Sequence, residues 1–296
     1  MSKVSVAVIG LNGFLGKPLL AALESGKFDD KLQFPIKAIT RKETPSTDKV
    51  QYVVGTLDEA NIDAIAEQIK GIDVIVELVH PTPELFAATE KLASLVKPKL
   101  YVPSQFGTDL IQVDTYSPGF LGAKTEHSKK LRALGVKVVD VITGFFFAPG
   151  AFLYEIVGHV GIDPATKTVV QRGAPETKIA VSSLPDIGYA VASIITKDPS
   201  TLPDTIRIQS DTITFQDVIN RYEKDHNVKL TVTETISKEE SLEDLKKRIA
   251  AGFKPSDFLI YLQIIAAQGL DKGLSFSEIH NELVNPGESL WKWSKY

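Results

Sequence analysis

The 296-residue chain contains no cysteine, and this absence excludes several kinds of site at once. Without thiols there are no disulfides, thiolate metal ligands, redox switches or cysteine nucleophiles, which fits a reducing compartment. The five histidines are scattered and form no HExxH pair, so we expect no metal site. Positive charge is not in excess, since 33 Lys and Arg stand against 37 Asp and Glu, which argues against nucleic-acid binding.

Long apolar runs are also missing from the sequence. The longest uncharged apolar stretch, 141–154, is too short to span a bilayer. The N-terminal segment lacks the basic flank and continuous apolar core of a signal peptide. We therefore expect a cytoplasmic protein that binds no membrane. A content of 43% hydrophobic and 24% charged residues is typical of a globular chain with a large core.

The first half of the sequence alternates apolar, β-branched runs with stretches that favour helices. Strands are predicted at 4–9, 34–39, 50–54, 73–76, 99–102 and 136–142, and helices at 14–25, 58–69, 84–96 and 120–134. Near-continuous apolar strands separated by helices are typical of a parallel sheet covered on both faces. The sequence therefore predicts an α/β fold with a Rossmann-like, doubly wound parallel sheet.

After residue 142 the pattern changes to an aromatic, proline-broken segment followed by more charged, helical sequence. Ser183–Asp186, Thr214–Asp217 and Ser241–Asp244 are capping-box patterns that predict helix starts. We predict that residues 1–146 form the domain of the parallel sheet and that elements of about 178–209 return to it. A smaller, mainly helical substrate-binding lobe would then comprise 147–177 and 210–296.

The first predicted strand runs directly into a glycine-rich turn and then into a helix. The turn contains Gly10, Asn12, Gly13, Phe14, Leu15 and Gly16. In this arrangement the backbone can approach a pyrophosphate at a helix N-terminus. The spacing GxxGxxG is one residue looser than GxGxxG and does not match a P-loop. We predict a dinucleotide-binding turn; the alternative is a turn that serves packing alone.

The second predicted strand ends at Thr40-Arg41-Lys42. A site that prefers NAD carries a carboxylate at this place, whereas a site for NADP carries cations that bind the 2′-phosphate. No carboxylate is present, and Arg41 can bind a phosphate through paired N–H groups. We expect Lys42 to add charge and Lys49 to approach from the following loop. The residues therefore predict NADP(H) as the cofactor; the alternative is an ordinary solvated basic turn.

Lys124 is the strongest candidate for catalysis. At about 100° per residue, it lies on the same stripe of the predicted helix 120–134 as its apolar and small neighbours, whereas Lys129 and Lys130 face away. A partly desolvated ammonium loses proton affinity, which suits proton transfer near neutral pH. The alternative is a lysine that extends from the stripe into solvent. The Tyr-x-x-x-Lys pair of ordinary short-chain dehydrogenases is broken, because Phe120 stands in the place of the tyrosine.

Further side chains follow the carboxyl ends of strands, where ligands bind in open parallel sheets. His80 follows the fourth strand, and Phe145, Phe146 and Phe152 follow the sixth. We predict them as substrate contacts. The alternatives are a turn histidine beside Pro81 and aromatic rings that belong to the core.

Several of these motifs occur together and in order. They are Gly10-x-x-Gly13-x-x-Gly16, Thr40-Arg41, Pro103-Ser104-Gln105-Phe106-Gly107, Lys124 with Leu131–Val136, and Asp186-Ile187-Gly188. The set resembles the NmrA-like, isoflavone-reductase-like branch of atypical short-chain dehydrogenases, over most of residues 4–195. Two positions depart from that branch: Ser104-Gln105 replaces a frequent Ser-Glu, and Ser128 replaces a frequent basic cofactor contact.

The resemblance implies an NADPH-dependent oxidoreductase with an NADP-binding Rossmann domain, and it places the active-site lysine of the family on Lys124. We expect hydride transfer to a small, apolar, aromatic carbonyl or enone substrate, by a monomer or a homodimer. The alternative is a non-catalytic, NADP(H)-sensing regulator that acts through a protein partner. The inward lysine favours the enzyme, and the missing tyrosine favours the sensor.

Overall fold

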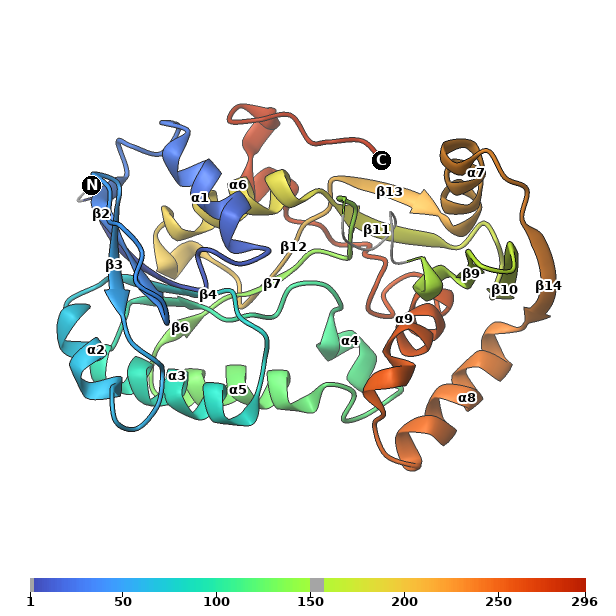
Figure 1. The fold of residues 1–296 in the computed structure, drawn as a ribbon, viewed down its shortest axis with the longest axis horizontal. Helices are drawn as coiled ribbons and strands as arrows, with labels where there is room; N and C mark the ends of the chain where they lie inside the picture. The colour runs from blue at the N-terminus through green and yellow to red at the C-terminus, as the bar shows by residue number, and fades with distance from the viewer. Residues whose placement is uncertain (1–2, 150–156) are drawn as a thin grey trace.

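The apolar runs of the first half form one parallel sheet. The computed structural model describes residues 3–149 and 157–296 (Figure 1). Its main sheet has the order β3-β2-β1-β4-β5-β6. The strands are β1 (Val4–Ile9), β2 (Leu32–Thr40), β3 (Val50–Val54), β4 (Val74–Glu77), β5 (Leu100–Val102) and β6 (Lys137–Val138). The order reverses between β1 and β4, and at such a switch point a crevice forms beyond the carboxyl ends of the strands.

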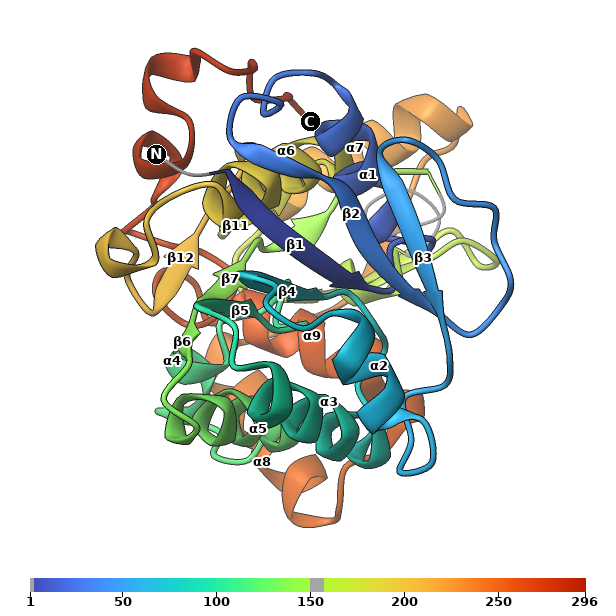
Figure 2. The same ribbon diagram turned by 90° about the vertical axis from the view of Figure 1, so that its left-hand side faces the viewer.

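Helices cover both faces of this sheet, as expected for buried parallel strands (Figures 1 and 2). One face carries α1 (Gly16–Glu24) and α6 (Leu184–Ile195), and the other carries α2 (Ile62–Gln68), α3 (Pro83–Val96) and α5 (Gly122–Ala133). Helices α1 and α6 pack closely, because a Cβ at Gly188 would lie 2.3 Å from the carbonyl oxygen of Pro18. The predicted doubly wound architecture is confirmed.

The strand predicted at 136–142 is divided in two by a change of partner. Its first part, β6, pairs with β5, and its second part, β7 (Asp140–Ile142), pairs in parallel with β12 (Thr205–Arg207). Residues from beyond 200 therefore pair with the chain that continues the edge strand of the main sheet.

A second core lies beyond the carboxyl ends of the main strands and occupies the right-hand side of Figure 1. Two small sheets contribute to it: β8 (Phe145–Phe146), β11 (Lys178–Ser182) and β13 (Asp211–Thr214) form one, and β9 (Ile162–Asp163), β10 (Thr168–Arg172) and β14 (Thr231–Ile236) form the other. The helices here are α4 (Leu110–Asp114), α7 (Phe215–His226), α8 (Lys238–Ala250) and α9 (Phe258–Ala267). This region contains more strand than the expected mainly helical lobe.

Helix starts follow the capping patterns with one exception. Ser183 caps α6, and Thr214 opens α7 with a complete capping box. The prediction that Ser241 opens a helix is wrong, because Ser237 and Glu240 form the capping box of α8 one turn earlier. Ser241 is instead buried inside that helix, where its hydroxyl oxygen accepts a hydrogen bond from Arg172.

The last residues return to the core of the main sheet. Helix α10 (Asn281–Val284) contributes Val284 to that core, where the Ser193 hydroxyl donates to its carbonyl oxygen. Trp291 stacks on Tyr189 of α6. Most of this segment therefore packs against the main sheet, because its apolar side chains cover the outer surface of α6, whereas Tyr296 packs on the second core. No helix of the described residues has the length and apolar character needed to cross a membrane.

Candidate functional site

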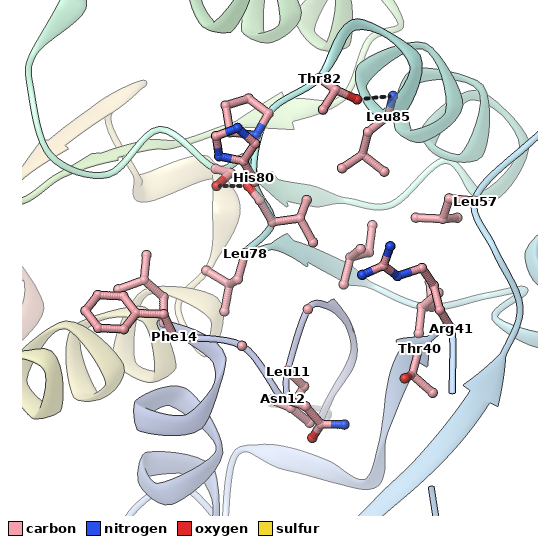
Figure 3. A pocket seen from close by; sticks show the side chains of 18 of the residues that line it. Leu11, Asn12, Phe14, Thr40, Arg41, Leu57, Leu78, His80, Thr82 and Leu85 are labelled. Carbon is pink, nitrogen blue, oxygen red and sulfur yellow. Dashed lines mark hydrogen bonds between the residues drawn. The ribbon is translucent and has the colours of Figure 1, made fainter. Parts of the chain in front are cut away.

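A cleft of about 950 Å³ lies at the carboxyl ends of the main strands (Figure 3). Its walls come from the segments that follow β1 to β5, together with Tyr52 of β3, the start of α3, Lys124 of α5 and Phe146 of β8. In Figure 3 the Arg41 side chain lies at one end of the cleft and Phe14 at the other. The topological switch point and the cleft therefore coincide, as the fold rule predicts.

The glycine turn forms the floor of this cleft. Gly10 has φ +89°, and a Cβ there would lie 2.5 Å from the Leu78 carbonyl oxygen, so the turn packs directly on the chain after β4. The N–H of Gly13 donates to the Gly10 carbonyl (2.9 Å), and a Cβ on Gly16 would lie 2.2 Å from that same oxygen. Helix α1 begins without a side-chain cap. Lys17 donates its N–H to the Gly13 carbonyl (3.0 Å) and Pro18 has none, so Gly16 is the residue of this first turn whose N–H is available to an anionic ligand.

The remaining predicted residues of the turn also line the cleft. Asn12 is held in place because its side-chain oxygen accepts a hydrogen bond from the Tyr52 hydroxyl (3.0 Å). Leu15 lines the wall at the start of α1. Phe14 is 47% exposed, and its ring centroid lies 6.1 Å from that of Phe146. These two rings bring the turn and β8 together at the end of the cleft far from Arg41.

Of the three predicted cations, only Arg41 lies in the cleft wall. Its guanidinium extends into the cavity above the glycine turn, and it makes no ion pair with any described residue (Figure 3). Lys42 is exposed in the turn after β2 and does not line the cleft. The placement of Lys49 at this site needs correction. Lys49 precedes β3, so it lies at the amino ends of the strands, where its Nζ pairs with Asp29 (2.8 Å).

Lys124 reaches the cleft from the first turn of α5, on the inward stripe that the periodicity predicts. Its Nζ donates to the carbonyl oxygen of Gln105 at 2.5 Å. Burial lowers the pKa of Lys124 to about 8, although the negative charges of Glu77 and Asp140 oppose this shift. A lysine with this pKa exchanges protons readily near neutral pH.

A buried polar cluster lies behind Lys124, and the sequence patterns gave no indication of it. His127 contacts two carboxylates, Glu77 at 3.1 Å and Glu90 at 2.9 Å, and the Tyr101 hydroxyl donates to Glu77 at 2.7 Å. Burial disfavours the charged imidazole, but the hydrogen bonds to Glu77 and Glu90 outweigh this and raise the pKa of His127 above its ordinary value. The cluster places negative charge beneath the lysine. Its one sequence signal is that His127 lies three residues after Lys124, on the same helix face.

A smaller apolar pocket of about 160 Å³ adjoins the Lys124 end of the cleft. Lys124 and Phe146 line both cavities, and Phe145, Phe258 and Leu262 line only the smaller one. The predicted aromatic contacts Phe145 and Phe146 therefore both lie in pocket walls, while Phe152 lies outside the described residues. His80 is exposed and lines the larger cleft above the glycine turn (Figure 3).

No tyrosine of the described residues takes the place of the broken Tyr-x-x-x-Lys pair. Phe120 is buried against Tyr261 in the second core. The Tyr116 hydroxyl donates to the carbonyl of Lys272 (2.7 Å), and Tyr116 lines neither cavity. Within the described part of the chain, Lys124 therefore has no tyrosine hydroxyl beside it at this end of the cleft.

Comparison with known proteins gives one family match and several matches of fold. The NmrA-like family matches residues 2–270 of the chain. A solved isoflavone reductase shares 20% identity at a TM-score of 0.65, covering 88% of this chain and 87% of that one. The leucoanthocyanidin reductase–NADPH complex from Vitis vinifera shares 18% identity at a TM-score of 0.65, covering 88% and 85%.

A solved nucleoside-diphosphate-sugar epimerase from Staphylococcus aureus shares 16% identity at a TM-score of 0.65, with 95% of each chain covered. The search among curated proteins finds no significant match. At these identities the solved structures establish the fold alone. Reductases and an epimerase share it, so the chemistry has to be argued from the residues of the cleft.

Proposed function

This chain belongs to the NmrA-like family, and we propose that it is an NADPH-dependent reductase. The observation that carries the proposal is the continuity of one cleft, which runs from an unpaired Arg41, over the glycine turn, to the half-buried Lys124. These three features match the parts of a phosphorylated dinucleotide. The cation suits the 2′-phosphate, the glycine turn suits the pyrophosphate, and the titratable group suits the nicotinamide end. The solved structures that share the fold include a reductase in complex with NADPH, which supports this assignment.

The glycine turn would hold the pyrophosphate. Gly13 carries no side chain between the turn and the cleft, and the N–H of Gly16 at the start of α1 would donate to a phosphate oxygen. Arg41 would bind the 2′-phosphate through paired N–H groups. When bound, NADPH supplies the hydride for the reaction.

Lys124 would act at the nicotinamide end. Its ammonium would hold the nicotinamide ribose or would give a proton to the substrate, either directly or through water. The hydrogen bond to the Gln105 carbonyl aims Nζ along the cleft wall, and the lowered pKa leaves a usable fraction of both protonation states near pH 8.

The substrate would bind in the adjoining pocket beside Lys124. Its walls are aromatic and aliphatic, with Phe145, Phe146 and Phe258 among them, and these exclude water from the reacting groups. We therefore propose a small apolar substrate, an aromatic carbonyl compound or an enone, whose oxygen faces Lys124.

Titration calorimetry with both coenzymes tests the cofactor assignment. We expect NADPH to bind more tightly than NADH. Arg41→Ala should weaken NADPH binding by about 10- to 100-fold, because it removes one charge-assisted hydrogen-bonded pair, and each factor of ten in affinity corresponds to roughly 1.4 kcal/mol. NADH binding should not change. Lys42→Ala is the matched control, because it removes the same charge one residue outside the cleft wall. Equal affinity of wild type and Arg41→Ala for NADPH would contradict the proposal.

A non-catalytic NADP(H) sensor is the second candidate, and the missing tyrosine hydroxyl favours it. A sensor needs the cofactor cleft but has no use for a desolvated lysine beside an apolar pocket. Oxidation of NADPH in the presence of a panel of aromatic aldehydes, ketones and cyclic enones separates the two. Turnover with any of them supports the reductase. Equal affinity for NADP⁺ and NADPH, with no turnover across the panel, supports the sensor.

A further inference from the structure

Gln105 is more closely connected to Lys124 than any motif indicates. It is 5% exposed and lies in the segment that follows β5. Its carbonyl oxygen accepts a hydrogen bond from Lys124 Nζ. Its side-chain Nε2 donates to the Lys124 carbonyl oxygen at 2.7 Å and to Ser128 Oγ at 2.8 Å. One residue therefore holds both the ammonium of the lysine and the helical turn that carries it.

The bonds beyond Gln105 show which way its amide is oriented. The Ser128 hydroxyl donates to Asp140 Oδ1 at 2.7 Å, and the other oxygen of Asp140 accepts from Arg132 at 2.8 Å. Asp140 takes part as an ionised acceptor, so the single proton of Ser128 is committed to it. The oxygen of Ser128 can then only accept from residue 105. Lys124 C=O is also only an acceptor, so both contacts require the NH₂ group of an amide.

We propose that Gln105 is a positioning residue for Lys124 and that the network requires an amide, not a carboxylate, at this place. The inference rests on the proposed function, since it concerns the same lysine. A glutamate here would face the carbonyl oxygen of Lys124 and would compete with Asp140 for the only proton of Ser128. The start of α5 would shift away from β5, and Nζ would leave its place in the cleft.

A second consequence is electrostatic. The neutral amide adds no charge beside the ammonium, whereas a carboxylate at the same place would stabilise the charged lysine and raise its pKa. Gln105 thus keeps Lys124 within reach of neutral pH while it fixes the position of the side chain.

The test compares Gln105→Glu with Gln105→Met in the full-length protein. We expect Gln105→Glu to lower kcat by about 10- to 100-fold, a typical cost of misplacing a catalytic group by about 1 Å. The KM for NADPH should stay within about threefold, because the phosphate end is unchanged. Gln105→Met keeps the volume but removes both side-chain bonds, so kcat should fall without any rise in the pKa of Lys124. Gln216→Glu, on the exposed face of α7, is the charge-matched control and should leave all these values unchanged.

The pKa of Lys124 is read directly by NMR of protein labelled with ¹³Cε-lysine, the Lys124 signal being identified by its loss in Lys124→Arg. We expect a higher pKa in Gln105→Glu than in wild type. A folded Gln105→Glu with unchanged kcat and unchanged Lys124 pKa would overturn the proposal. Absence of turnover in the wild type would defeat the proposed function alone, because the Lys124 signal of Gln105→Met, which adds no charge, still shows whether Gln105 fixes the lysine.

Ser128→Ala provides a second measurement if Gln105→Glu does not fold. It removes the acceptor of one Gln105 bond and leaves the charge of residue 105 unchanged. We expect kcat to fall severalfold with the KM for NADPH constant, and a normal melting temperature. Wild-type kcat in a folded Ser128→Ala variant would show that the connection to Asp140 does not position the lysine, and the proposal would fail.

Discussion

The two ends of the cleft are built in different ways. The end near Arg41 combines the backbone of the glycine turn with a few side chains, and its parts come from β3 and from the segments directly after β1, β2 and β3. The end near Lys124 consists of side chains from elements far apart in the sequence. Gln105 lies 19 residues before the lysine, and the carboxylate cluster behind it joins Glu77 to His127 across 50 residues.

Under the proposed function, this difference separates binding from catalysis. The glycine turn is held by its own hydrogen bonds and by close backbone contacts, so it is preorganised for an anion whatever occupies the other end. Lys124 depends on the packing of α5 against β4 and β5, through partners that each have other contacts to satisfy. We therefore expect substitutions at one end to change affinity and substitutions at the other to change turnover.

Lys124→Ala should produce the largest effect. Loss of a proton donor or of a group that holds the reacting ring costs about 10²- to 10⁴-fold in kcat. NADPH affinity should stay within about threefold, because the phosphate contacts remain. Stopped-flow measurement of NADPH oxidation, together with calorimetry, gives both values. Lys129→Ala, on the exposed face of the same helix, is the control. Unchanged turnover would remove Lys124 from the active site.

The pH dependence of turnover sharpens the assignment of Lys124. The donor form is the ammonium, which is present below the pKa, and burial lowers that pKa to about 8. If Lys124 gives the proton, kcat should be constant below about pH 7 and should fall as the pH rises through 8. A kcat that is flat to pH 9.5 would assign the lysine to holding the ribose.

At the end near Arg41 the sequence predicts the glycine turn and Arg41, because the information is local there, but it also predicts Lys42 and Lys49, which do not line the cleft. A strand followed by three glycines and a helix can form only a few structures, and Arg41 follows a strand whose carboxyl end must face the same crevice. Lys49 shows the limit of this reasoning. It is close to Arg41 in sequence, but it precedes a strand, and a residue just before a parallel strand lies at the opposite edge of the sheet. The direction of the parallel strands therefore excludes Lys49 from the cleft.

The Lys124 end is only partly predictable, because its network depends on tertiary contacts. Periodicity places the lysine on the inward face of α5, and the position of Gln105 just after β5 is a usable signal. Nothing local indicates that the amide of Gln105 would meet Ser128, or that His127 would lie between two carboxylates. These contacts arise when α3 and α5 pack on the sheet, which no pattern within one segment specifies.

Gly16→Ala should produce the second-largest effect, now at the phosphate end. The added methyl would lie 2.2 Å from the Gly10 carbonyl oxygen and 2.3 Å from that of Leu11, both backbone atoms that cannot move without opening the turn. We expect NADPH affinity to fall by about tenfold or more and stability to fall by roughly 1–3 kcal/mol, as for other overpacked sites. Calorimetry and chemical denaturation measure these effects.

Gly122→Ala is the matched control for this substitution, because a methyl at the start of α5 would have no heavy atom within 4 Å. If Gly16→Ala lowered kcat while NADPH affinity stayed at the wild-type value, the separation between a binding end and a catalytic end would be wrong.

Lys49→Ala should produce the smallest effect, because Lys49 lies at the amino ends of the strands, at the edge of the sheet opposite the cleft. Lys49 pairs with Asp29 where both side chains are partly exposed, at 33% and 46%, so the pair contributes less than about 1 kcal/mol to stability. Its Nζ also lies 4.5 Å from the centroid of the Phe34 ring, which adds a similarly small amount.

Neither contact reaches the cleft, so NADPH affinity should remain within about twofold in calorimetry, whereas Arg41→Ala weakens it at least tenfold. Equal losses in the two variants would mean that cations from both edges of the sheet converge on the ligand, and that strand direction does not decide which cations reach the cleft.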